Sequence, residues 1–113
     1  MAAYIVSPQA INKKIKTDLY TEDGKGPLGD RIIKGHLFGG ACDWYLTEYS
    51  ADDDLGFGFC HIGNDQGAEW TYINITELRE FNELPQLLKI EWDRYWKPVP
   101  ANQIEKIVRC GGC

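Results

Sequence analysis

Apolar residues recur with helical spacing near the start of the chain. Ser7 and Pro8 suit the N-cap and the first position of a helix. Ile11, Ile15 and Leu19 then follow at intervals of four residues, which places their side chains on one face of a helix. We therefore predict an amphipathic helix of about three turns whose apolar face packs on the rest of the fold.

Four strand-like runs come next, each rich in aromatic and branched side chains. They are separated by short turns that contain glycine, serine or aspartate, and they cover residues 31–38, 42–49, 55–62 and 69–73. Strands joined by such short connections pair antiparallel. The pattern therefore predicts an antiparallel meander.

A second, short helix is predicted after the fourth strand. Asn74 and Glu77 have the N-cap and N3 spacing of a capping box. Leu78 and Phe81 then lie on one face until Pro85 ends the segment.

The C-terminal part is apolar but only weakly periodic. Residues 87–96 predict a further strand or extended segment, and residues 104–108 predict one or two last helical turns. With no linker between these elements, we expect a single α+β domain over residues 1–113. Its sheet has four or five antiparallel strands in a meander, with the N-terminal helix packed on it and one or two short helices.

Composition agrees with a packed core and gives no sign of a membrane segment. Apolar residues make up 43% of the 113 positions and include four Trp, six Tyr and four Phe. No apolar run approaches the roughly 18 residues of a membrane helix. The first eight residues lack the basic and apolar regions of a signal peptide. We therefore expect a cytoplasmic protein that does not bind membranes.

Acidic residues are concentrated in the middle of the chain. Residues 41–83 contain ten acidic side chains and one basic side chain, Arg79, whereas each flank carries a formal charge of +2. Such a segment repels nucleic acid and anionic membranes and attracts basic surfaces. We therefore expect a partner protein with a basic surface and no direct nucleic-acid binding.

The cysteines are too few for a disulfide-stapled scaffold of this length. Cys110 and Cys113 have metal or redox spacing, but they lie at the C-terminus, outside the turn in which a redox thiol gains a low pKa. A zinc site needs two more ligands, for which the scattered candidates are Cys42, Cys60, His36 and His61. We expect free thiols and no cofactor, with a zinc site as the alternative.

Two further patterns have a structural and a chemical interpretation. Glu48 and Glu69 fall on predicted strands and would suit general acid and base catalysis if paired, but they are more simply exposed strand residues. Six aromatic residues on the predicted strands could form a stacking platform for single-stranded nucleic acid, but most of them are more simply the sheet's inward face under the two helices: Trp44, Tyr45, Phe57, Phe59, Trp70 and Tyr72. The acidity of this segment disfavours the platform.

Four motifs occur in a fixed order and spacing between about residues 34 and 104. They are Trp44-Tyr45-x-Thr47-Glu48-Tyr49, Gly56-Phe57-Gly58-Phe59, Glu69-x-x-Tyr72-Ile73-Asn74-Ile75-Thr76-Glu77-Leu78 and Asp93-Arg94-Tyr95-Trp96-x-Pro98-x-Pro100. This series resembles the DUF2958 family of small bacterial, phage and plasmid proteins. The resemblance implies a setting on mobile elements and no assigned activity. Trp70-Thr71 departs from the family pattern, and the cysteines are not part of it.

The leading hypothesis is a small, acidic, non-enzymatic binding protein of a mobile element. It would inhibit a host defence or nucleic-acid-processing protein, in the manner of an anti-CRISPR or anti-restriction protein, by presenting carboxylates to a basic surface while a few aromatic anchors supply affinity. The expected partner-binding residues are Glu48, Asp52, Asp53, Asp54, Asp65 and Glu69. One alternative is an enzyme or metal-dependent domain that uses Glu48, Glu69, His61 and the cysteines. The other is a soluble α+β domain of unknown function in which acidity only maintains solubility.

Overall fold

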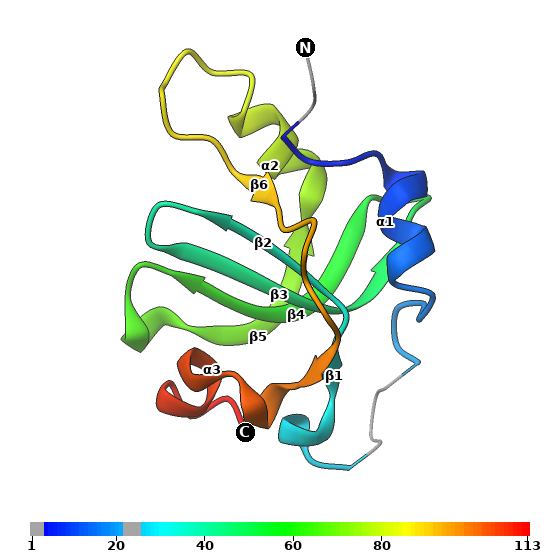
Figure 1. Cartoon of the computed structure of the whole chain (residues 1–113), viewed down its shortest axis with the longest axis vertical. Coiled ribbons are helices and arrows are strands. Elements are labelled where there is room, and N and C mark those ends of the chain that lie inside the picture. The colour runs from blue at the N-terminus through cyan, green and yellow to red at the C-terminus, as the bar shows by residue number, and fades with distance from the viewer. Residues whose placement is uncertain (1–3, 22–25) are drawn as a thin grey trace.

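The computed structural model describes residues 4–21 and 26–113, so part of the predicted loop at residues 21–29 lies outside it. Its main feature is a five-stranded antiparallel sheet with the order β5-β4-β3-β2-β6 (Figure 1). The strands are β2 (Gly35–Gly39), β3 (Cys42–Ser50), β4 (Leu55–Ile62), β5 (Glu69–Asn74) and β6 (Glu91–Trp92). The predicted meander of an α+β fold is confirmed.

Two of the predicted strands are shorter than expected. The run at residues 31–38 divides at Lys34 into β1 (Ile32–Ile33) and β2, and β1 pairs with β7 (Val99–Pro100) in a small second sheet. The run at residues 87–96 contains only β6, because residues 82–90 form a loop held by its own side chains. The second sheet ties the C-terminal segment to the beginning of the meander.

The N-terminal helix α1 (Pro8–Lys14) begins where the sequence predicts, since Ser7 accepts a hydrogen bond from the N–H of Ala10 at 3.2 Å. The prediction of about three turns is wrong, because the backbone of Ile15 is already extended, with φ −116° and ψ 96°. Two residues after Ile15, the carbonyl of Thr17 accepts a hydrogen bond from the N–H of Tyr49 in β3 at 2.9 Å. This hydrogen bond to β3 holds residues that a further helical turn would need, so the helix ends before them.

The other helices are short. α2 (Ile75–Phe81) begins at its predicted N-cap, where Asn74 accepts a hydrogen bond from the N–H of Glu77 at 3.2 Å. α3 (Glu105–Arg109) covers most of the predicted last turns. Three 3-10 turns complete the list: η1 (Leu28–Asp30), η2 (Asp65–Gly67) and η3 (Ala101–Gln103). No helix among the described residues is long and apolar enough to cross a membrane.

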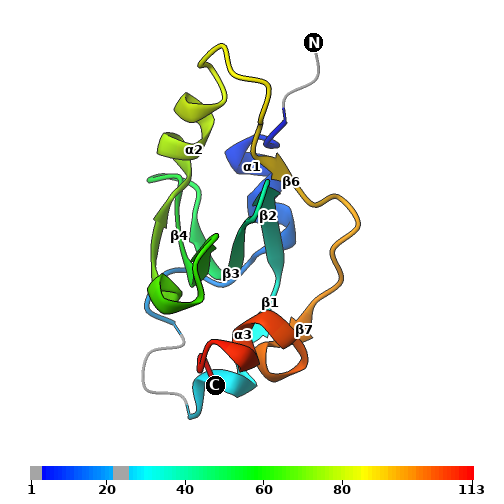
Figure 2. The same cartoon turned by 90° about the vertical axis from the view of Figure 1, so that its left-hand side faces the viewer.

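The sheet buries side chains on both of its faces. One face packs with α1 and α2 around a core that includes Ile11, Leu37, Trp44 and Ile75. The other face packs against the C-terminal segment, which contributes Ala101 and Ile107. In both views α2 and α3 lie at opposite ends of the molecule (Figures 1 and 2).

The expectation that most of the six aromatic side chains form the sheet face under α1 and α2 is wrong. Side chains alternate along a strand, so Trp44 belongs to the core under α1 and α2 while Tyr45 points to the other face. Cross-strand pairing places Phe59 and Trp70 on the same face as Tyr45. Tyr45, Phe59 and Trp70 therefore pack in the core between the sheet and the C-terminal segment.

Candidate functional site

The turn between β3 and β4 contains three consecutive aspartates with different environments. Asp52 and Asp53 are exposed, whereas Asp54 is only 8% exposed and has a left-handed backbone with φ +50°. The prediction that Asp54 presents its carboxylate to a partner is therefore wrong, because this side chain is buried. Its side chain faces α2, where it contacts Thr76 and Arg79.

The Asp54 carboxylate holds the turn against α2. It accepts hydrogen bonds from the hydroxyl of Tyr49 at 2.6 Å, from the hydroxyl of Thr76 at 3.1 Å and from Nε of Arg79 at 2.8 Å. Burial alone raises the pKa of the Asp54 carboxyl, but the hydrogen bonds from Arg79, Tyr49 and Thr76 outweigh it and lower this pKa below 3.8. Arg79, the one basic residue of the acidic segment, is thus neutralised locally and does not offset the exposed carboxylates.

Glu48 is also buried, although it was expected to be an exposed strand residue. Its side chain is buried, with 1% exposed, and Oε1 accepts a hydrogen bond from the backbone N–H of Tyr20 at 3.2 Å. β4 separates it from Glu69: Glu48 is opposite Phe57, and Glu69 is opposite Cys60. The suggested catalytic pair of Glu48 and Glu69 is therefore wrong, and Glu48 is not available to a partner.

α2 contributes carboxylates that the sequence analysis did not assign to the site. Glu77 and Glu80 are exposed on the helix, and exposed Glu83 follows it. The spacing of three residues places Glu77 and Glu80 next to each other on the helix surface, a signal that was readable in the sequence. The turn adjoins α2, because the carbonyl of its Asp54 accepts a hydrogen bond from the N–H of Ile75 at 3.0 Å. We name the combined set the acidic surface: Asp52, Asp53, Glu77, Glu80 and Glu83.

The two other predicted carboxylates lie outside the acidic surface. Glu69 is exposed at the beginning of β5, at the opposite end of this strand from α2. Asp65 is exposed, but its carboxylate accepts two hydrogen bonds from Arg109, each of 3.0 Å, and a third from Nε2 of His61 at 2.6 Å. The bonds from Arg109 and His61 hold the pKa of Asp65 well below its usual range. Asp65 thus belongs to a local ion pair.

One potential metal-ligand atom from each of His61, Asp65 and Cys110 lies within 4.8 Å of the other two. The N–H of Gly63 donates to Nδ1 of His61 at 3.2 Å, so the neutral ring carries its proton on Nε2 and donates it to Asp65. A metal at Nε2 would require the proton on Nδ1, against the Gly63 N–H. Burial, followed by the charge of Asp65, raises the pKa of the Cys110 thiol. Arg109 already balances the carboxylate, so these groups fit an ion-pair cluster better than a metal site.

The two glycines between Cys110 and Cys113 have a structural role. Gly111 has a φ of +77°, and the N–H of Gly112 donates to the carbonyl of Ile107 at 2.9 Å, as in a Schellman motif that ends a helix. The carbonyl of Gly112 in turn accepts a hydrogen bond from the indole N–H of Trp70 at 2.6 Å. The two glycines between the cysteines thus end α3 and dock the tail on the sheet.

The cysteines do not converge on one site. Cys42 and Cys60 lie on the sheet face that packs with α1 and α2, and Cys110 packs on the other face. All four cysteines are among the described residues, and none forms a disulfide. Of the suggested zinc ligands Cys110 and Cys113 with Cys42, Cys60 or His61, the structure brings together only Cys110 and His61, so the four-ligand site is not assembled.

His36 occupies a separate polar cluster. Its Nε2 lies 2.7 Å from Asp43, its Nδ1 lies 3.0 Å from Asp93, and the ring stacks on Tyr45. Lys106 forms an ion pair with Asp43 from α3. Burial raises the pKa of Asp43, but hydrogen bonds from His36 and Lys106 outweigh it and hold this pKa below its usual range. The hydrogen-bond partners of the two histidine side chains are Asp43 and Asp93 for His36, and Asp65 and the N–H of Gly63 for His61.

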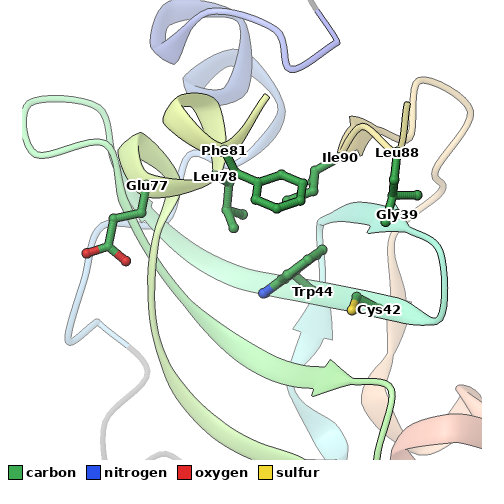
Figure 3. Close-up of a pocket in the computed structure, with 8 residues that line it drawn as sticks. All are labelled: Gly39, Cys42, Trp44, Glu77, Leu78, Phe81, Leu88 and Ile90. Carbon is green, nitrogen blue, oxygen red and sulfur yellow. The ribbon is translucent and has the colours of Figure 1, made fainter. Parts of the chain in front are cut away.

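An apolar hollow of about 330 Å³ adjoins the acidic surface. Its lining residues come from β2, β3, α2 and the loop after α2: Gly39, Cys42, Trp44, Glu77, Leu78, Phe81, Leu88 and Ile90. Figure 3 shows Leu78 and Phe81 pointing from α2 toward Trp44 on β3, while the carboxylate of Glu77 stands to one side. The hollow and the acidic surface therefore share Glu77.

Comparison with known proteins gives one result. No curated protein and no solved structure matches the chain. A model of the family described as protein of unknown function (DUF2958) matches residues 11–105, which extends the resemblance found in the sequence toward the N-terminus and leaves out the C-terminal cysteines. The chain therefore belongs to the DUF2958 family.

Proposed function

We propose that this protein is a non-enzymatic binding protein that presents its acidic surface to a basic surface of a partner protein. One observation carries the proposal: Asp52, Asp53, Glu77, Glu80 and Glu83 are exposed on adjoining elements, while the nearby cation is paired with a buried carboxylate. Complementary charge accelerates association and selects partners with basic surfaces.

The partner class follows from the sign of the charge. Proteins that process nucleic acid bind phosphates through Lys and Arg, so their binding surfaces are basic. A set of exposed carboxylates competes with phosphates for such a surface. We therefore propose that the partner is a host defence or nucleic-acid-processing protein, which this chain inhibits by occupying its nucleic-acid-binding surface.

The experiment uses charge reversal with a control that has the same change in net charge. The test variant combines Asp52→Lys, Asp53→Lys and Glu80→Lys. The control variant reverses three exposed acidic residues outside the acidic segment: Asp18→Lys, Asp30→Lys and Glu91→Lys. Both variants and the parent are immobilised, and the proteins captured from a lysate of the native host are quantified by mass spectrometry.

We expect the parent and the control variant to retain a common basic protein that the test variant loses. This protein should also be released as the salt concentration rises past about 0.15 M, where screening acts over roughly 8 Å. If the test variant retains every protein that the parent retains, or if the control variant loses the same protein, the acidic surface is not the binding site. The acidity then only maintains solubility.

A further inference from the structure

The hollow beside the acidic surface has the dimensions of a side-chain pocket. Its volume of about 330 Å³ is at the lower end of the roughly 300–1,000 Å³ range of ligand sites. Its floor and walls are apolar, with Trp44 and Cys42 on β3 and Phe81 on α2 (Figure 3). Such a space holds one or two bulky side chains, and it is small for a large cofactor.

One wall of the hollow is fixed before any partner binds. Residues 82–90 form a loop in which the Asn82 amide mimics a strand partner: it donates to the carbonyl of Ile90 at 2.8 Å and accepts from the N–H of Ile90 at 2.7 Å. Gln86 donates to the carbonyl of Phe81 at 2.9 Å. A preorganised wall lowers the entropy cost of binding.

The only cation of this loop is directed inward. Nζ of Lys89 donates to the carbonyls of Asn82 and Leu84, each at 2.8 Å. The ammonium group therefore satisfies the loop backbone. The carboxylate residue that lines the hollow is Glu77, and exposed Glu80 lies three residues further along α2. An incoming segment meets an apolar pocket with an acidic edge.

A second copy of this chain fits this surface poorly. A two-fold dimer is isologous, so each residue at the interface would lie opposite the same surface of its partner. Glu77, Glu80 and Glu83 would then face one another, and like charges in an interface are costly. The complementary occupant has the opposite sign of charge.

We infer that the hollow receives one or two bulky apolar side chains from a basic segment of the partner protein, with Lys or Arg of that segment set against Glu77 and Glu80. This inference rests on the proposed function and adds the chemistry of the segment that docks. Energy in interfaces is concentrated in anchors that fill a pocket, with polar contacts around them. The apolar anchor supplies affinity, and the acidic surface supplies orientation and rate.

The test uses three synthetic peptides of equal length on the parent chain. The first is Lys-Lys-Leu-Phe-Lys-Lys, the second replaces its apolar residues with serine, and the third replaces its lysines with glutamate. Binding is followed by NMR, with the indole N–H of Trp44 and the amide of Phe81 as reporters of the hollow. We expect saturable shifts of both signals with the first peptide only.

Two variants of the loop separate the hollow from general charge. Leu88 lines the hollow and is 49% exposed, whereas Leu87 is in the same loop, is fully exposed and lies outside the lining. We expect Leu88→Asp to weaken the first peptide about tenfold or more, in the range of one apolar anchor, and Leu87→Asp to weaken it less than about threefold. Melting temperatures of both variants verify that they are folded.

The outcomes distinguish this inference from the proposed function. If the first two peptides bind equally, the hollow is not the anchor site. The same conclusion follows if Leu88→Asp and Leu87→Asp weaken the first peptide equally and the Trp44 signal does not shift. Capture of a partner through the acidic surface is not overturned by either result. Equal binding of the glutamate peptide overturns the basic character of the occupant. Sedimentation that shows a dimer of the parent, lost in Leu88→Asp, assigns the surface to a second copy and also overturns the inference.

Discussion

Replacement of Asp54 by asparagine tests the junction between the β3–β4 turn and α2. Asparagine has nearly the same size and tolerates the left-handed backbone found here, φ +50°, so the substitution removes the charge without backbone strain. The carboxylate bonds Tyr49, Thr76 and Arg79, two of which come from α2. The loss of charge therefore weakens the attachment of α2 to the turn.

The expected magnitude follows from burial and from the remaining partners. Loss of one member of a buried ion pair costs about 3–5 kcal/mol. The Arg79 side chain is 25% exposed and still donates to the carbonyl of Ile5 at 3.2 Å, and the asparagine oxygen keeps part of the acceptor capacity. We therefore expect Asp54→Asn to lower the free energy of unfolding by about 2–3 kcal/mol, or the melting temperature by about 8–12 °C at this chain length.

Urea and thermal unfolding, followed by far-ultraviolet circular dichroism at neutral pH, measure this difference. Asp53→Asn is the matched control, because Asp53 is the preceding residue of the same turn and is exposed. We expect the control to remain within about 0.5 kcal/mol of the parent. Equal stability of the two variants would refute the structural role of Asp54.

The pH dependence gives a second test of the same junction. Because the pKa of Asp54 is lower in the folded chain than its ordinary 3.8, the unfolded chain binds this proton more readily. The stabilisation is therefore fully present above about pH 4 and decreases as the pH falls through the lowered pKa. The difference in unfolding free energy between parent and Asp54→Asn should shrink on acidification, and a difference that stays constant to about pH 2 would contradict this.

Three other variants test the packing of the fold by thermal unfolding. Ile15→Asp places a charge at a fully buried position and should cost several kcal/mol, so a parent-like melting temperature would show that α1 is not docked as described. Gly112→Ala brings its Cβ to 2.6 Å from Phe59 and should cost about 1–3 kcal/mol, whereas an unchanged melting temperature would show that the tail is not packed there. Cys110→Ser with Cys113→Ser should change stability by less than about 1 kcal/mol, because the glycines between them dock the tail, and a large loss would assign that role to the thiols.

Local sequence signals predicted much of the fold. The bounds of β4 agree with the predicted residues 55–62, because alternating apolar residues lie between clear turn residues. The capping residue Asn74 located the beginning of α2 for an equally local reason. The end of α1 was missed because a tertiary hydrogen bond from β3 to Thr17 replaces the helical one, and no local pattern contains that information.

The candidate site was predicted in location but only partly in its residues. Charge counting identified the acidic segment, yet nothing local distinguishes Asp54 from its two aspartate neighbours. The distinction comes from Arg79, which lies 25 residues later in the sequence and pairs with Asp54 in space. A lone cation among ten carboxylates was itself a hint that one of them is neutralised. Glu48 is buried because this part of β3 is covered on both faces, so that Trp44 to Tyr49 are all buried, and alternation along the strand does not reveal such cover.

The most direct test of the central claim is the association rate of this chain with the protein that it captures. Surface plasmon resonance measures this rate at ionic strengths from about 0.05 to 0.5 M for the parent and for the variant with Asp52→Lys, Asp53→Lys and Glu80→Lys. Binding guided by the acidic surface predicts a fast parent rate at low salt that falls steeply as salt rises, and a slow variant rate at every salt concentration. Equal rates for the two proteins at low salt would contradict the account.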